Sequence, residues 1–210
     1  MRFMGWDDFK LITKLDAIND LEVLFNSTNS MCKQQYEALE KQAEGIDDEE
    51  VKQEFYEFHQ EHFLLYEETL PRINNYSILT NIWTHLEFNI YQLANEAIKK
   101  FGLTVSVTGN KLDDYLRFCR VNIEGEFVDS EKEEKKEILR IIRNRIIHDN
   151  GYVKRESTNI QHVKAIEYVE SHEGLSFTED DRIIVVNSYV EECLSVAREI
   201  LVEIHSAIYK

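Results

Sequence analysis

The sequence predicts an all-α fold, and three observations support this prediction. The 210 residues contain one proline and seven glycines, too few turn signals for a sandwich or barrel of many short strands. Leucine, isoleucine, glutamate and lysine are plentiful, and apolar residues recur at helical spacing in several long stretches. With 43% hydrophobic and 30% charged residues, the chain suits one globular unit and is neither disordered nor collagen-like.

The amino-terminal third predicts two helical stretches. Residues 6–26 carry an apolar residue at about every third position, which is close to the period of a helix. Residues 30–70 continue the helical pattern, with a break at Gly45, a new N-cap near Asp47, and an end at Pro71. The core stripe of this second stretch is expected to consist of its aromatic side chains, Phe55, Phe58, Phe63 and Tyr66.

The clearest helical pattern spans residues 77–102, where Gly102 is the stop signal. Glu87 lies at the edge of its apolar face and is expected to need a basic partner. The apolar face itself consists of Leu79, Ile82, Trp83, Leu86, Ile90, Leu93 and Ala97.

The remainder of the chain predicts three more helices and one small β-hairpin. A helix begins at Asp129 or Ser130 and ends at Asn150-Gly151, with glutamates in its first turn and arginines later, as the helix dipole prefers. The other predicted elements are a short helix over 111–120, a hairpin over 176–186 and a final helix over 187–209.

Charge is distributed unevenly along this acidic chain. The formal net charge is −16, from 40 acidic and 24 basic residues, which by itself argues against nucleic-acid binding. Residues 1–70 carry −11, whereas residues 135–155 carry +5. The second stretch contains seven basic residues, Lys135, Lys136, Arg140, Arg143, Arg145, Lys154 and Arg155. A basic footprint for RNA is therefore predicted within residues 135–155.

The basic helix is predicted to have one apolar face and one face of polar and charged side chains that are suited to catalysis. At about 100° per residue, Arg140, Arg143, Asn144 and His148 fall on the arc opposite the isoleucines. His148 lies in the last turn, where its ring can reach solvent. An arginine that is always charged and a histidine that exchanges protons are sufficient equipment for cleaving RNA without a metal ion.

The run from Arg143 to His148 reads R-N-x-x-x-H and resembles the R-x4-6-H signature of the HEPN family, with Asn144 at a position that is commonly polar. The likeness extends over residues 72–210, since the helix at 77–98 looks like the family's other core helix, and residues 1–71 are then an added helical extension. The resemblance implies an up-and-down helical bundle, packed here as one globular unit, that forms a homodimer through the motif helix.

The resemblance also implies roles for the motif residues. In metal-independent RNA cleavage, His148 would transfer the proton, Arg143 would stabilise charge in the transition state, and Asn144 would orient the phosphate or the histidine. Geometry and charge add Arg140, together with Lys136 and Lys154 from the basic stretch, as substrate-binding residues. We expect no metal ion and no cofactor.

Other positions remain open or depart from the family. HEPN toxins that are silenced by nucleotidyltransferases carry a tyrosine two residues after the histidine, where this chain has Asn150. Arg145 points into the apolar arc and is expected to be structural, in a pair with Glu87. Arg143 and His148 could also be ordinary helix charges, balanced by Glu137 and the helix dipole.

Three classes of function are therefore compared. The first is a HEPN-type endoribonuclease that acts on RNA, such as a transfer RNA, as a toxin or anti-phage effector with an antitoxin or defence-system partner protein. The second is a non-catalytic HEPN-like module that binds nucleotide or RNA, and the third is a structural interaction protein. The sequence has no apolar run of membrane-spanning length and no signal peptide, so we expect a cytoplasmic protein without membrane contact.

Overall fold

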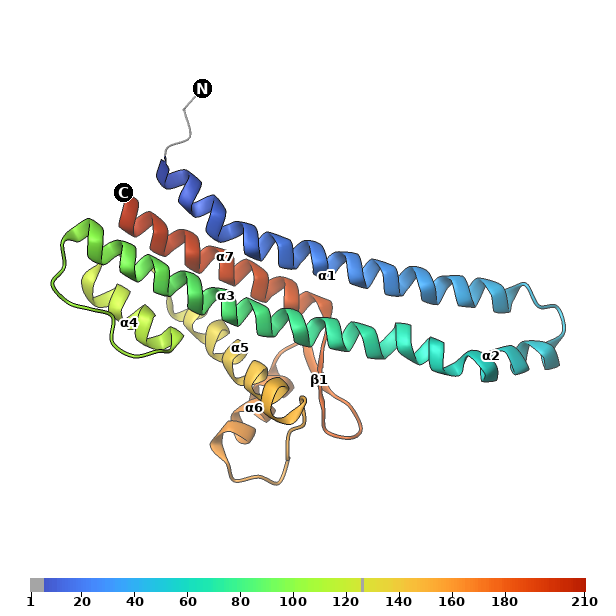
Figure 1. The fold of residues 1–210 in the computed structure, drawn as a ribbon. Helices are drawn as coiled ribbons and strands as arrows, with labels where there is room; N and C mark the ends of the chain where they lie inside the picture. The colour runs from blue at the N-terminus through green and yellow to red at the C-terminus, as the bar shows by residue number, and fades with distance from the viewer. Residues whose placement is uncertain (1–5, 126) are drawn as a thin grey trace.

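The computed structural model describes residues 6–125 and 127–210, and it confirms the prediction of a helical bundle with one small hairpin (Figure 1). In chain order the elements are α1 (Trp6–Glu44), α2 (Glu49–Leu64), the π-helical turn η1 (Leu65–Thr69), α3 (Leu70–Phe101), α4 (Leu112–Asn122), α5 (Ser130–Asp149), α6 (Ile160–Ser171), β1 (Leu175–Phe177), β2 (Ile183–Val185) and α7 (Asn187–Tyr209). The two strands pair antiparallel, with Ser176 opposite Ile184.

Helix α3 is the axis of the bundle. It contacts α1 and α7 along one side, and α4 and α5 on the other (Figure 1). Every residue of its predicted apolar face is buried. The three cysteines, Cys32, Cys119 and Cys193, are free and buried. Among the described residues, no helix is both long and apolar enough to cross a membrane.

The first half of α1 belongs to the bundle core. Ile18 and Phe25 are almost completely buried, and Leu21 is 8% exposed. The second half of α1 leaves the bundle and, together with α2, forms a long helical hairpin that projects from one end (Figure 1). Residues 1–71 therefore cannot be removed as a unit without exposing the apolar face of α3.

The helix does not end at Pro71, contrary to expectation, because a π-turn leads into it. Proline has no N–H and its ring clashes with the carbonyl four residues earlier, so it is normally excluded from a helix interior. Here the preceding turn is widened, and the Leu70 N–H donates to the carbonyl oxygen of Leu65, five residues back. The chain thus stays helical from α2 through η1 into α3.

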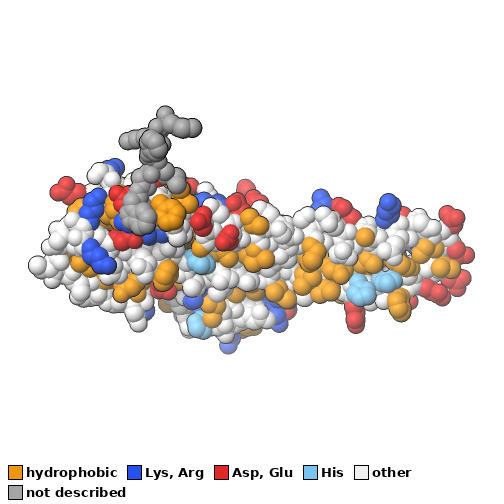
Figure 2. Space-filling view, turned by 45° about the horizontal axis from the view of Figure 1, so that its top comes forward, with side chains coloured by type: hydrophobic (Ala, Val, Ile, Leu, Met, Phe, Trp, Pro, Cys, Tyr) orange, Lys and Arg blue, Asp and Glu red, His pale blue; other side chains and the backbone are white. Residues whose placement is uncertain are grey.

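The predicted aromatic core stripe of α2 is wrong. No residue of α2 is buried, and Phe58 is 82% exposed. Tyr36 of α1 and Phe63 pack edge to face with ring centroids 5.5 Å apart, but no helix layer covers the outer side of this two-helix hairpin in the described part of the chain. Figure 2 shows hydrophobic and histidine side chains along the hairpin and acidic side chains at its tip.

A matched pair of substitutions tests this assignment of core and surface. Phe25→Ala should lower the free energy of unfolding by about 3–5 kcal/mol, because it empties a buried site between packed helices. Phe58→Ala removes the same atoms from an exposed site and should change the free energy by less than about 0.5 kcal/mol. Urea denaturation followed by circular dichroism measures both, and similar losses would contradict the placement of α1 in the core.

Candidate functional site

Helix α5 presents the motif residues because its two faces differ in the way the sequence predicts. Asp129 caps its start by accepting a hydrogen bond from the Lys132 N–H at 2.9 Å. The isoleucine face is buried against the bundle, whereas Arg143 and Asn144 are half-buried and His148 is exposed. The three motif residues thus lie on one outward arc, with the exposed Ile147 between them.

The end of α5 is fixed by a turn that only these residue types allow. Asn150 and Gly151 both have positive φ, and the Gly151 N–H donates to the Arg145 carbonyl at 3.0 Å. A Cβ on Gly151 would overlap the hydroxyl of Tyr76, which itself donates to the carbonyl of Ile183 at 2.5 Å. Because α3 and β2 hold this turn, the last turn of α5, which carries His148, has a fixed position.

Arg143 is held by hydrogen bonding yet has no counter-charge. Its Nη1 donates to Oδ1 of Asn144 at 3.0 Å, and its buried Nε has no hydrogen-bond partner. A buried N–H of a charged group without an acceptor is costly, and an anion would supply the acceptor. Asn144 therefore orients the guanidinium of Arg143, whereas the role predicted for it is to orient the phosphate or the histidine.

Most of the other described arginines do have a carboxylate partner. Arg143 and Arg72 are the two described arginines with no carboxylate oxygen within 4.0 Å. The others each have such a partner: Arg117, Arg120, Arg140, Arg145, Arg155, Arg182 and Arg198. In a chain with 40 acidic residues, these two arginines are the described ones whose guanidinium groups are not neutralised by a direct ion pair. No sequence pattern includes Arg72, and the sequence alone does not show which arginines are paired, because Arg120, Arg155 and Arg198 find their carboxylates through the tertiary fold.

Most of the positive charge predicted for residues 135–155 is neutralised in the fold. Lys136, one of the predicted substrate-binding residues, is only 3% exposed and forms ion pairs with Asp113 of α4 and with Glu133, so its ammonium group is not free to contact a phosphate in this structure. Arg140 is bound by Glu137 through two hydrogen bonds of 2.6 and 2.7 Å. These acids occupy the basic groups that would otherwise contact a phosphate.

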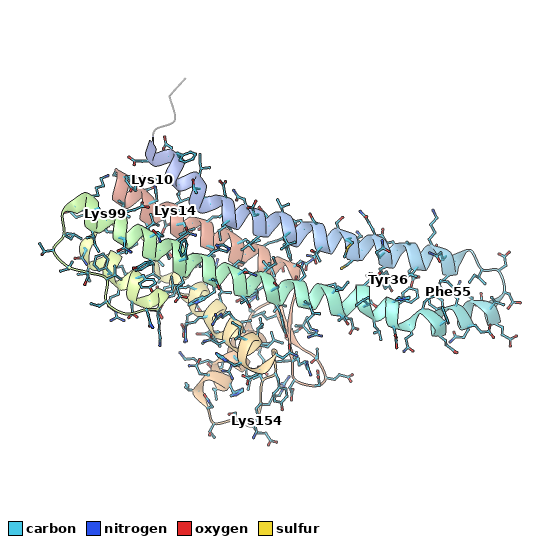
Figure 3. All side chains as sticks on the ribbon, viewed as in Figure 1. Lys10, Lys14, Tyr36, Phe55, Lys99 and Lys154 are labelled. Carbon is cyan, nitrogen blue, oxygen red and sulfur yellow. The ribbon has the colours of Figure 1, made fainter. Side chains whose placement is uncertain are left out.

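Lys154 has a different position. It is exposed on the loop after α5, which extends away from the layer of long helices (Figure 3). Within the described part of the chain no carboxylate lies within ion-pair distance of its ammonium group. Of the predicted substrate-binding residues, Lys154 is therefore the one with a free charge.

The predicted pair between Glu87 and Arg145 does not form. Glu87 instead accepts a hydrogen bond from the backbone N–H of Leu112 at 3.1 Å, at the start of α4. Arg145 forms a 2.7 Å ion pair with Asp149, one turn later on α5, and its Nη1 lies 3.0 Å from Nε2 of His162. Glu87 thus contacts α4, and Arg145 contacts both Asp149 of its own helix and His162 of α6.

His162 connects α6 to the motif helix and must be neutral to do so. The Lys154 N–H donates to Nδ1 at 3.2 Å, and Nη1 of Arg145 lies 3.0 Å from Nε2; a neutral imidazole can accept at one ring nitrogen only, and a protonated ring at neither. Burial, followed by the charge of Arg145, lowers the pKa of His162 below its ordinary value of about 6.5. The loop that carries Lys154 is thus attached to α5 through a neutral imidazole.

This contact predicts a loss of stability in weak acid. Because the pKa of His162 is lower in the folded state, the unfolded chain binds the proton first, and stability is lost as the pH falls below about 6.5. Between pH 7.5 and 5.5 we therefore expect the melting temperature to fall through this group. His162→Gln, which retains an acceptor without titrating, should reduce the fall, whereas His59→Gln on α2 should not. An unchanged slope in His162→Gln would contradict the assignment.

Comparison of the chain with models of protein families, with curated proteins and with solved structures found no match. The functional assignment therefore depends on the chemistry of the α5 face and its surroundings.

Proposed function

We propose that this chain is a metal-independent endoribonuclease whose active site is built on α5. One observation carries the proposal: Arg143 keeps a guanidinium without a carboxylate partner, oriented by Asn144, on the same outward arc as the exposed His148. Neighbouring basic residues on α5 are paired with acids, so this charge is available to an anion. The spacing of the three residues is that of the HEPN motif, which this segment resembles.

The proposed reaction uses both side chains. His148 accepts the proton of the ribose 2′-OH while the 2′ oxygen forms a bond to the adjacent phosphorus. Arg143 stabilises the negative charge that accumulates on the phosphoryl oxygens. The bond between phosphorus and the 5′ oxygen then breaks, and the leaving oxygen takes a proton from water or from a second imidazole. The products are a 2′,3′-cyclic phosphate and a 5′-hydroxyl.

A homodimer would bring two copies of this face together. Ile147 is 43% exposed at the centre of the arc, between the motif residues. Its burial against a second copy would enclose the two motifs in one cleft and provide the second imidazole. We therefore include dimerisation through α5 in the proposal.

The biological role we propose is that of a toxin or anti-phage effector held in check by a partner protein. The projecting α1–α2 hairpin offers a surface for such a partner, since it combines exposed apolar side chains with an acidic tip (Figure 2). A basic antitoxin or defence-system protein would complement this charge.

Cleavage of RNA in EDTA tests the proposed chemistry. The purified protein should convert RNA to fragments with cyclic-phosphate ends, and His148→Ala should reduce the rate by about 10²–10⁴. Arg143→Ala should reduce it by about 10²–10³, because charge in the transition state is no longer stabilised. Product ends can be identified by mass spectrometry of a short oligonucleotide.

Two controls separate catalysis from contamination and from loss of charge. Arg117→Ala removes an exposed arginine from α4 and should leave the rate unchanged. An oligonucleotide with 2′-deoxyribose at every position should remain intact, since it lacks the nucleophile. A parent protein that binds RNA without cleaving it would favour the non-catalytic binding module.

The oligomeric state is tested by light scattering at micromolar concentration. We expect a mass of twice the 24.9 kDa of the chain, and Ile147→Asp should yield the monomer with a large loss of cleavage. Val121→Asp alters another exposed apolar residue, on α4, and should leave the dimer intact. A monomeric parent would contradict a shared cleft.

A further inference from the structure

A groove between α3 and α5 begins beside the motif. It is lined on α3 by Arg72, Ser77 and Asn81, and on α5 by Ile146 and Asn150. None of the described residues that line it is acidic, and α3 carries no acidic residue from Leu70 to Leu86. In a protein with a net charge of −16 this is an unusually long helix face without negative charge.

Arg72 supplies the positive charge of the groove. Its guanidinium carbon lies 5.9 Å from the centroid of the Tyr76 ring, which is itself held by the bond to Ile183. As noted above, Arg72 has no carboxylate within 4.0 Å among the described residues. The guanidinium thus rests on a fixed aromatic surface and keeps its hydrogen-bond donors for a ligand.

The polar groups of the groove wall suit a nucleotide chain. Asn81 donates to the carbonyl of Ser77 at 2.9 Å, which leaves its amide oxygen as an acceptor. The side chain of Asn150 is exposed at the end of α5. Hydroxyl and amide groups of this kind contact ribose and base edges.

The position of Arg143 relative to the groove defines the path that an RNA strand would follow. Arg143 and Asn150 are seven residues apart and therefore lie on the same side of α5, separated by about 10 Å along its axis. At about 3.4 Å of rise per nucleotide, this separation corresponds to about three nucleotides of a stacked single strand. A strand with one phosphate at Arg143 would thus reach the Asn150 end of the groove, whose lining also includes Arg72, after about three nucleotides.

We propose that the α3–α5 groove binds the sugar-phosphate chain of single-stranded RNA that flanks the cleaved phosphate, with Arg72 as its phosphate contact. This inference rests on the proposed function, because it takes Arg143 as the contact at the cleaved phosphate. It assigns Arg72 to substrate binding alone.

Binding of a 2′-O-methyl RNA oligonucleotide, which cannot be cleaved, tests the groove directly by fluorescence anisotropy. Each phosphate contact contributes about 0.7 to the slope of log affinity against log salt, or about fivefold in affinity at 0.1 M salt. Arg72→Gln should therefore bind about fivefold more weakly and lower the slope by about 0.7. Arg117→Gln, the same change at an exposed site on α4, should bind like the parent.

A second variant covers the case in which Arg72→Gln disturbs the fold, which a melting curve would reveal. Ser77→Asp places a negative charge on the exposed groove wall and should weaken binding at least as much. Equal affinities of parent and both variants, or an equal loss in Arg117→Gln, would overturn the groove assignment.

Cleavage kinetics distinguish failure of the groove from failure of the proposed function. In a cleaving parent, Arg72→Gln should raise KM about fivefold and leave kcat unchanged, whereas Arg143→Ala should lower kcat. A parent that cleaves RNA while Arg72→Gln has unchanged KM would retain the function and reject the groove. A parent that does not cleave, but loses affinity in Arg72→Gln, would retain the groove and reject catalysis. A parent that does not bind RNA would reject both.

Discussion

The burial of one face of α3 is the interaction on which the rest of the structure depends. α1, α4, α5 and α7 all pack on this helix, and its apolar residues form the centre of the core. The same helix holds the end of α5 through Tyr76, whose hydroxyl leaves room for glycine alone at position 151. The placement of His148 is thus a consequence of core packing rather than of the motif itself.

The excess of acidic over basic side chains determines how charge is distributed on the surface of this protein. Most described arginines form an ion pair with a carboxylate, in several cases from another element. Ion pairs that are exposed or half-exposed contribute little to the stability of the fold. Their effect is to remove positive charge from most of the surface. Arg72 and Arg143 are the two described arginines whose charge is not neutralised in this way. Over a few ångströms their positive charge would attract a phosphate chain.

Much of the fold follows from local sequence signals. The Asn150-Gly151 stop, the Asp129 cap, the hairpin before α7 and the apolar face of α3 each depend on residues close together in the chain, and each is predicted correctly. The aromatic stripe of α2 is wrong because periodicity shows that a helix has an apolar side but cannot show whether another helix covers it. The break expected at Pro71 fails because a π-turn absorbs the proline.

The site is less predictable than the fold, for an electrostatic reason. The net charge of +5 for residues 135–155 is a sum that ignores ion pairs. In the fold, Lys136 forms an ion pair with Asp113 of α4. Arg145 forms an ion pair with Asp149 and contacts the ring of His162. Sequence can place a residue on a helix face and can show a partner on the same helix, such as Glu137 for Arg140, but a partner on another element, such as Asp113 for Lys136, comes from tertiary packing. The absence of a carboxylate neighbour among the described residues is therefore the criterion on which we propose a binding role for an arginine of this chain. By that criterion Arg143 and Arg72 belong to the same group, although only Arg143 is part of the motif.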